Sequence, residues 1–259
     1  MKRVAPLRYD VIFKKAFSDP EIFTAFVHDV LGVHIEINKV ETEKSFKPPI
    51  GRVASRFDLF AEDPKNRIVV DIQHVRYLDH YDAFLHYHCA AILEQVAKAE
   101  NYRPKLAVYR IIVLTSGDKH NVDLATIDFD PKTRNGQGLG EIPHKVVYLC
   151  PKYANDATPA PLREWLRAID DTLDETVEEE TYQNPLIQRI FGLIEQDSIS
   201  PEERARMFEE YNQEMLKQET IQQRTIEIAR AMLAKGLDID LIVELTNLSK
   251  IEIDALSER

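Results

Sequence analysis

The stretch SRFDLFAEDPKNRIVVDIQHV, residues 55–75, carries the pattern that decides the fold. Polar and apolar residues alternate from Val53 to Phe60, and Ile68 to Val75 is a second run rich in β-branched residues, so two strands are predicted. Between them, Asp63-Pro64-Lys65-Asn66 has the composition of a turn. Ile35 to Thr42 also alternates, and we therefore expect the hairpin to belong to an antiparallel meander.

The segments that follow extend the predicted sheet. A helix is expected from Asp79 to about Ala99, and the strongly apolar run Leu106 to Thr115 reads as a strand buried on both faces. A strand–helix–strand unit favours a parallel crossover, so the sheet should be mixed. Ser116 to Glu141 is expected to be a long loop or excursion, followed by a strand at Lys145 to Cys150.

Helices are predicted on both sides of these strands in the sequence. Tyr9 to Phe17 has the apolar spacing of a helix, and Asp19-Pro20 caps and starts a second helix that ends at Gly32. A further helix is expected near Pro161 to Leu173. The order predicts an α/β (α+β) fold in which helices flank a mixed central sheet, with a C-terminal helical extension.

The charges of the chain are unevenly distributed. Residues 1–169 carry 24 Lys and Arg against 22 Asp and Glu, whereas residues 170–259 carry 9 against 22. The acidic run Asp170 to Glu180 reads as a solvated helix end and linker, so we expect one domain at residues 1–175 and an acidic helical tail at residues 176–259. The first domain could present a basic cleft to DNA, because phosphate binding depends on Lys and Arg.

The tail is predicted to be helical at Asn184–Gln196, Pro201–Lys235 and, as two short helices, Leu237–Leu256. Ser249 and Glu252 form a capping box at the start of the last helix. Three interpretations of this short two-helix hook stay open: a helix-turn-helix DNA reader, a protein-interaction or homo-oligomerisation element, or a packing element. Lys250 is its only basic residue before the terminal Arg259, which disfavours the DNA reader.

Polar residues on the predicted hairpin indicate chemistry. Asp71 and Gln73 project from the same face of a strand that is otherwise apolar on both sides. A buried carboxylate needs a partner, and Asp58 on the neighbouring strand can place a second carboxylate nearby. Two close carboxylates repel unless a cation lies between them, and hard oxygen ligands suit Mg²⁺ or Mn²⁺. Taken alone, an Asp on each arm of a hairpin is also typical of turn caps and surface residues.

Several short motifs together resemble a known family. They are the D-x-x-F-K-x-x-F opening at Asp10–Phe17, Asp58, Asp71-x-Gln73, Gln95 followed by Tyr102, and the tail segments Ala231–Gly236 and Ile242–Ser249. Their order and spacing resemble the PD-(D/E)XK nuclease family transposases, also called recombination-promoting nucleases or the Rpn family. The second acidic residue is Asp71 where Glu is commoner, and Phe84 stands where many members have Arg.

The resemblance implies a restriction-endonuclease-like fold and a Mg²⁺-dependent DNA endonuclease that promotes recombination or serves a mobile element. Asp58, Asp71 and the backbone carbonyl of Ile72 would hold Mg²⁺, for which Mn²⁺ could substitute, and the metal would activate water for phosphodiester hydrolysis. Gln73 stands in the position of the superfamily's Lys, and its neutral amide would orient the water. The alternative is a catalytically inactive nuclease fold that binds DNA or protein as an accessory factor.

Three further residues are secondary candidates. Asp10 could add an outer carboxylate to the metal site, or cap the first helix. His74 lies next to the expected site and could touch phosphate. Gln95 lies on the inward stripe of its helix, where it is either a site residue or a core residue; His88, on the same stripe, is expected to be a hydrogen-bonded core residue.

Other classes of protein are disfavoured. No stretch approaches the roughly 18 consecutive apolar residues of a membrane helix, and the start of the chain lacks the apolar core of a signal peptide, so we expect a cytoplasmic protein. The sequence contains no phosphate-binding loop, nucleophile elbow or dinucleotide fingerprint, which disfavours nucleotide hydrolysis and acyl chemistry.

Overall fold

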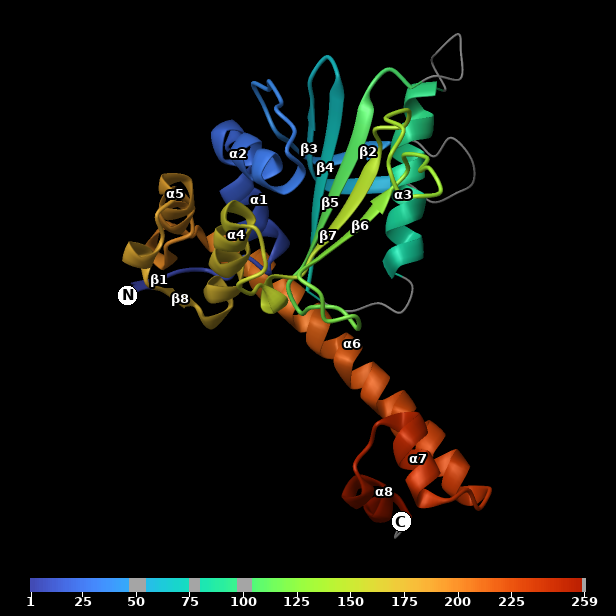
Figure 1. Cartoon of the computed structure of the whole chain (residues 1–259). Coiled ribbons are helices and arrows are strands. Elements are labelled where there is room, and N and C mark those ends of the chain that lie inside the picture. Colours follow the sequence, from blue (N-terminus) through green and yellow to red (C-terminus); the bar gives the residue numbers. More distant parts are fainter. Residues whose placement is uncertain (47–54, 75–79, 97–103, 258–259) are drawn as a thin grey trace. The chain divides into compact units, whose positions relative to one another are not determined.

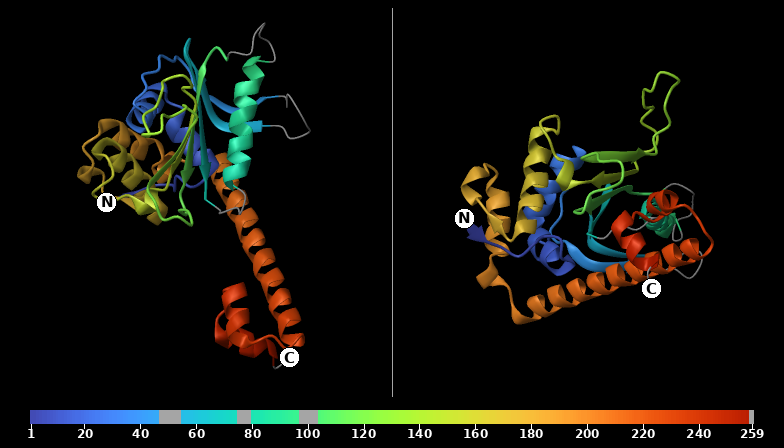
Figure 2. Two further views of the ribbon diagram at one scale, coloured as in Figure 1. Left: turned by 45° about the vertical axis from the view of Figure 1, so that its right-hand side comes forward. Right: turned by 90° about the horizontal axis from the view of Figure 1, so that it is seen from below.

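A computed structural model describes residues 1–46, 55–74, 80–96 and 104–257 (Figures 1 and 2). The chain forms two compact units, Met1–Met207 and Phe208–Arg259.

A six-stranded sheet forms the centre of the first unit, with strands in the order β2-β3-β4-β5-β7-β6. The strands are β2 (Glu41–Phe46), β3 (Ser55–Glu62), β4 (Asn66–Gln73), β5 (Ala107–Leu114), β6 (Leu124–Asp128) and β7 (Lys145–Leu149). β2, β3 and β4 pair antiparallel, β4, β5 and β7 pair parallel, and β6 runs antiparallel to β7. The predicted mixed sheet is therefore confirmed.

The turn of the β3–β4 hairpin forms where the sequence predicted it. Oδ1 of Asp63 accepts hydrogen bonds from the backbone amides of Lys65 at 2.7 Å and Asn66 at 2.6 Å. Pro64 follows Asp63, and its fixed φ angle suits a turn. Local chemistry thus determines the register of the two strands that carry Asp58 and Asp71.

Two strand predictions need correction. The segment expected to be a strand from Ile35 to Thr42 enters the sheet only at β2, which begins at Glu41. Ile35 and Val40 are instead buried in the core from an irregular segment. The predicted loop from Ser116 to Glu141 contains β6, which has one neighbour in the sheet and is partly exposed, so it lacks an apolar pattern.

Helices cover both faces of the sheet (Figures 1 and 2). They are α1 (Asp10–Phe17), α2 (Pro20–Leu31), α3 (His80–Val96), α4 (Ala160–Asp171) and α5 (Pro185–Leu193). The main core joins α1, α2, α4 and α5 to one face, which includes Leu59, Val70 and Ile111. α3 packs on the other face, where Phe84 and Ala91 lie in smaller clusters.

Aromatic packing holds α1 in place. The ring centres of Phe13 and Phe17 are 4.5 Å apart, and that of Phe26 on α2 lies 5.0 Å from Phe17 and 5.5 Å from Trp165 on α4. Nε1 of Trp165 donates a hydrogen bond to Asp29 at 2.7 Å. These contacts fix α1 to α2, to α4 and to the sheet. The polar residues on the other side of α1 are therefore held in place as well.

The first unit continues beyond the predicted boundary at residues 175 and 176. β1 (Lys2–Arg3) pairs with β8 (Thr176–Val177), and α5 contributes Ile187, Ile190 and Phe191 to the main core. The acidic composition of this region reflects its exposed side, while its apolar side packs against α1 and α2. The compact unit accordingly ends at Met207 rather than at residue 175.

The second unit has its own small core. It contains the later part of α6 (Pro201–Ala234), α7 (Ile239–Thr246) and α8 (Lys250–Ser257). Ala229, Ile242, Leu248 and Ile253 are buried together. The predicted capping box is present, because Oε2 of Glu252 accepts from the amide of Ser249 at 2.8 Å while Oγ of Ser249 accepts from the amide of Glu252 at 3.3 Å.

Across the described ranges, no helix has the length and apolar character needed to cross a bilayer.

Candidate active site

The β3–β4 hairpin opens at Asp58 and Asp71. The backbone ladder pairs Leu59 with Val70. Next to this pair, the amide of Asp58 donates to Oδ1 of Asp71 at 3.3 Å, and the amide of Ile72 donates to Oδ2 of Asp58 at 2.9 Å. Each carboxylate replaces a backbone acceptor of the opposite strand, and the two acidic residues meet at one point of the sheet.

The carbonyl of Ile72 faces the same point. In a strand, the N–H and C=O groups of one residue point to the same side. The N–H of Ile72 donates to Asp58 on β3, whereas the carbonyl of the next residue, Gln73, accepts from the amide of Thr115 beside β5 at 2.9 Å. The Ile72 carbonyl is therefore directed to the β3 side, where the Asp58 carboxylate lies.

Burial and mutual repulsion make the two carboxylates hard to ionise together. Burial, followed by the charges of Asp71 and Asp10, raises the pKa of Asp58 to about 8. Burial also raises the pKa of Asp71, which is 3% exposed, although the guanidinium of Arg110 opposes the shift. Such a pair holds a proton near neutral pH unless a cation replaces it.

A buried arginine that the sequence analysis did not single out holds Asp71. Nη2 of Arg110 lies 2.7 Å from Oδ2 of Asp71, and Arg110 is 1% exposed. Its guanidinium carbon lies 5.2, 4.9 and 5.4 Å from the ring centres of Phe57, Phe84 and Tyr87. The sequence held one signal that could have identified Arg110: it is a single charged residue in the apolar strand β5. A buried charge of this kind needs a partner on a neighbouring strand.

His88 is buried on α3, as expected, but the hydrogen bonds expected for it are not found within the described residues. Neither ring nitrogen has a hydrogen-bond partner among the residues that the structure describes, and the ring stacks on Phe129 at 5.2 Å. Burial, with Arg110 and His144 as smaller contributors, lowers the pKa of His88 to about 3. His88 is therefore a neutral core residue.

The first helix adds a carboxylate and an amine. Tyr9 is the N-cap of α1 and Asp10 its first residue, so the N-cap interpretation of Asp10 is wrong. Oδ2 of Asp10 accepts a hydrogen bond from Nζ of Lys14 at 2.6 Å, and the same nitrogen lies 4.0 Å from Oδ1 of Asp58. Lys14 thus contacts Asp10 and lies near Asp58. In the sequence, Lys14 stood out only as part of the D-x-x-F-K-x-x-F motif.

Gln73 and His74 lie where β4 ends. Gln73 is two residues after Asp71, so its side chain projects from the same face of the strand. Nε2 of His74 lies 2.8 Å from Nη1 of Arg8, and Nδ1 lies 2.8 Å from Oγ1 of Thr115. Because Arg can only donate, Nε2 is the acceptor, and His74 holds Arg8 at this edge of the sheet.

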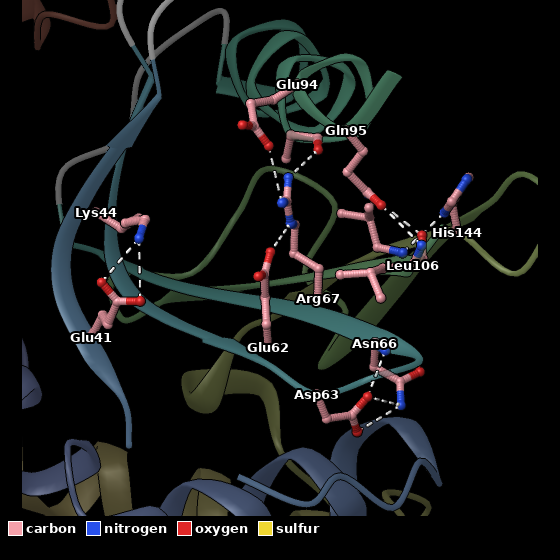
Figure 3. A network of polar contacts seen from close by, with 12 residues as sticks. Glu41, Lys44, Glu62, Asp63, Asn66, Arg67, Glu94, Gln95, Leu106 and His144 are labelled. Carbon is pink, nitrogen blue, oxygen red and sulfur yellow. Dashed lines mark hydrogen bonds and ion pairs between the residues drawn. The ribbon is translucent and has the colours of Figure 1, made fainter. Parts of the chain in front are cut away.

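Gln95 lies away from this site. Its Oε1 accepts a hydrogen bond from the amide of Leu106 at 2.9 Å (Figure 3). Leu106 precedes β5, whereas Asp71 pairs with Ile112 on the same strand. At about 3.3 Å per residue, roughly 20 Å of strand separates the two positions. The structure brings Gln95 to the opposite end of the sheet, where it connects α3 to β5.

The oxygen atoms at this site are of the type that binds hard cations. Within the described ranges, no group of three or more His, Cys, Asp or Glu side chains is arranged to hold a metal ion. Mg²⁺ does not need such a group, because it commonly takes one or two carboxylates and keeps several waters. Asp58, Asp71 and the Ile72 carbonyl supply only oxygen donors, and the mutual repulsion of the carboxylates, which contributes to the raised pKa of Asp58, would be relieved by a cation between them.

The comparisons with known proteins concern the second unit. Residues 222–258 match the model of the C-terminal HTH domain of the Rpn/YhgA-like nuclease family. This segment contains the end of α6 together with α7 and α8. No curated protein and no solved structure matches the chain.

Proposed function

We propose, on the Rpn family assignment that the match of residues 222–258 supports, that this chain is a Mg²⁺-dependent DNA endonuclease. Its reaction would be the hydrolysis of phosphodiester bonds, in the service of recombination or of a mobile element. The observation that carries the proposal is the opened hairpin, where the carboxylates of Asp58 and Asp71 meet and burial raises the pKa of Asp58 to about 8.

Asp58, Asp71 and the carbonyl of Ile72 would hold the metal. When bound, Mg²⁺ supplies Lewis acidity to the phosphate and lowers the pKa of a coordinated water. Arg110, on the neighbouring strand β5, holds Asp71 from the same face of the sheet, so that this carboxylate keeps one orientation. The amide of Gln73, which can both donate and accept, is suited to orient a water molecule on the same face.

Basic side chains at this end of the sheet suit the DNA backbone. Arg8 is held by His74 and donates to the hydroxyl of Tyr9 at 2.8 Å. The side chain of Arg56, at the start of β3, is 64% exposed and pairs with Glu43 at 2.7 Å. Guanidinium groups bind phosphate oxygens with two donors at once, so both residues are candidates for backbone contacts.

The proposal is tested by cleavage of supercoiled plasmid. Wild type, Asp58→Ala and Asp71→Ala are each assayed with Mg²⁺, Mn²⁺, Ca²⁺ or EDTA. The control is Glu41→Gln, which removes a carboxylate of β2 that pairs with Lys44 at the surface. We expect nicking or linearisation by wild type and Glu41→Gln with Mg²⁺ or Mn²⁺, and none by the other two variants. Equal cleavage by all four proteins would indicate contamination and contradict the proposal.

A catalytically inactive fold that binds DNA or protein is the second candidate. One observation favours it: both oxygens of Asp71 have protein partners, the amide of Asp58 and the guanidinium of Arg110. DNA binding without cleavage by any variant would support this candidate. A melting temperature that rises with Mg²⁺ in wild type but not in Asp71→Ala would show that a metal site exists.

A further inference from the structure

We infer that Lys14 is a further active-site residue, whose ammonium group binds the phosphate that is cleaved. The inference rests on the proposed function. The amide of Gln73, on the face of β4 that carries Asp71, has no charge to offer a phosphate. Lys14 on α1 lies beside the two acidic strands, with its Nζ 4.0 Å from Oδ1 of Asp58, and supplies a positive charge at this place.

Lys14 is a buried cation among three carboxylates. It is 8% exposed, and its Nζ lies 2.6 Å from Oδ2 of Asp10, 3.3 Å from Oε1 of Glu43 and 4.0 Å from Oδ1 of Asp58. These partners come from α1, β2 and β3. Lysine is rarely buried without such partners, so the position of the ammonium group is set by three elements at once.

The hydrogen bonds of Lys14 leave room for one more acceptor. An ammonium group has three N–H donors. Among the described residues, its hydrogen bonds go to Asp10 and Glu43, while the distance of 4.0 Å to Asp58 is too long for a hydrogen bond. The third donor is thus available to a phosphate oxygen that enters beside Asp58.

The backbone of β2 is strained at the residue that reaches Lys14. β2 and β3 pair Thr42 with Leu59 and Lys44 with Phe57, and Glu43 between them has a φ of 57°. Left-handed backbone is unfavourable for a residue other than glycine and persists only where the surrounding structure holds it. Here it interrupts the ladder opposite Asp58 and brings the Glu43 carboxylate to the ammonium group.

Lys15 provides a matched control on the same helix. Its Nζ bonds the carbonyl of Ser198 at 2.7 Å and Glu203 at 2.9 Å, away from the acidic strands. Phe13 and Phe17, both fully buried, fix the helix itself. Replacing Lys14 or Lys15 removes one positive charge from α1, but only Lys14 lies at the site.

The test compares Lys14→Met, Lys15→Met and the double variant Lys14→Met/Gln73→Lys. Plasmid cleavage is measured with Mg²⁺. Binding of a fluorescent DNA duplex is measured against salt concentration with Ca²⁺, which neutralises the same carboxylates but prefers more ligands and longer bonds. Melting temperatures show which variants are folded, and Lys14→Gln replaces Lys14→Met if the latter is not.

We expect Lys14→Met to cleave about 100-fold more slowly than wild type, as for loss of one transition-state donor. Its DNA affinity should depend less on salt, with a slope reduced by about one, because one phosphate contact is lost. Lys15→Met should resemble wild type in both. The double variant should recover at least about tenfold of the lost rate, because the charge returns to the face of β4 that carries Asp71.

Two results would overturn the inference. Cleavage by folded Lys14→Met at the wild-type rate would show that the amine is only a counter-ion for the carboxylates. An unchanged salt slope, together with no recovery in the double variant, would show the same. If the wild type itself does not cleave DNA, the proposed function fails and this inference with it; the first two results leave the proposed function intact.

Discussion

At the scale of single residues, the stability of the fold depends on the buried ion pair of Asp71 and Arg110. The guanidinium of Arg110 is buried, and its attraction to the carboxylate of Asp71, 2.7 Å away, offsets part of the cost of removing it from water. Bringing such a pair out of water offsets most of its attraction, so the pair adds little net stability. Losing one partner is different, because the other charge is then buried alone.

We therefore expect Arg110→Met to lower the free energy of unfolding at pH 7 by about 3–5 kcal/mol, measured by urea denaturation. The double variant Arg110→Met/Asp71→Leu should lose less than the single variant, because no uncompensated charge remains. If the effects of the two substitutions simply add, the carboxylate and the guanidinium do not interact, and the role of Arg110 described above is wrong.

The raised pKa of Asp58 predicts a pH dependence of stability. In the folded protein this carboxyl keeps its proton up to a pKa of about 8, against an ordinary value of 3.8. Its contribution to the free energy of unfolding is therefore complete below about pH 4 and is lost as the pH rises toward 8, at most about 1.4 kcal/mol per pH unit.

Asp58→Asn removes this dependence, because an amide does not titrate. In EDTA, the stability of the variant relative to wild type should rise between pH 5 and pH 8, as shown by urea denaturation at each pH. Glu41→Gln is the matched control and should follow the wild-type profile. Parallel profiles for Asp58→Asn and wild type would mean that the carboxyl is ionised throughout this range.

At the scale of elements, polar side chains connect α3 to the sheet far from the site. Nη2 of Arg67 on β4 donates to Glu94 at 3.0 Å, and its Nη1 donates to the carbonyl of Ala91 at 2.6 Å (Figure 3). One helical turn after Ala91, the side chain of Gln95 accepts a hydrogen bond from the amide of Leu106. These contacts anchor the end of α3, so that its other residues, including Phe84, lie over Arg110.

Gln95→Ala should accordingly reduce stability but not chemistry. Loss of the hydrogen bond to Leu106 leaves a partly buried amide unpaired and should cost about 1–3 kcal/mol in the free energy of unfolding. The cleavage rate per folded molecule should equal that of wild type. Gln73→Ala is the comparison, because it should lose rate with little change in stability; a rate loss in Gln95→Ala would restore a site role for Gln95.

At the scale of the whole molecule, both units carry more acidic than basic residues, and the excess per residue is larger in the second unit. Residues 1–207 carry 33 Asp and Glu against 27 Lys and Arg. Residues 208–259 carry 11 Asp and Glu against 6 Lys and Arg. The HTH family match suggests DNA binding for this unit, yet α8 presents Glu252 and Asp254 together with an exposed Ile251. DNA binding through phosphate contacts depends on Lys and Arg, which are more frequent relative to acids in the first unit.

We expect the salt dependence of DNA binding to come mainly from the first unit. Arg56→Gln should lower the slope of log affinity against log salt by about one, whereas Lys250→Gln should leave it unchanged. Both side chains are exposed, by 64% and 61%, so neither change should disturb the fold. A slope that falls only in Lys250→Gln would instead make the C-terminal unit the main DNA reader.

The sequence by itself determined the features that depend on neighbours in the chain. The turn at Asp63, the alternation in β3, the β-branched run in β4, the apolar stripe of α3 and the capping box at Ser249 are all local, and the mixed sheet flanked by helices follows from their order. The hairpin alone also brings Asp58 close to Asp71, because its turn fixes which residues are opposite each other.

Only the tertiary structure decided which distant elements meet. The partner of Asp71 is Arg110 on a parallel strand, and Lys14 reaches Asp58 from a helix that aromatic packing holds in place. Gln95 lies at the other end of the sheet because α3 has a particular length and direction. Such contacts join residues far apart in sequence, and their free energy appears only when the whole core is packed, so no local pattern specifies them.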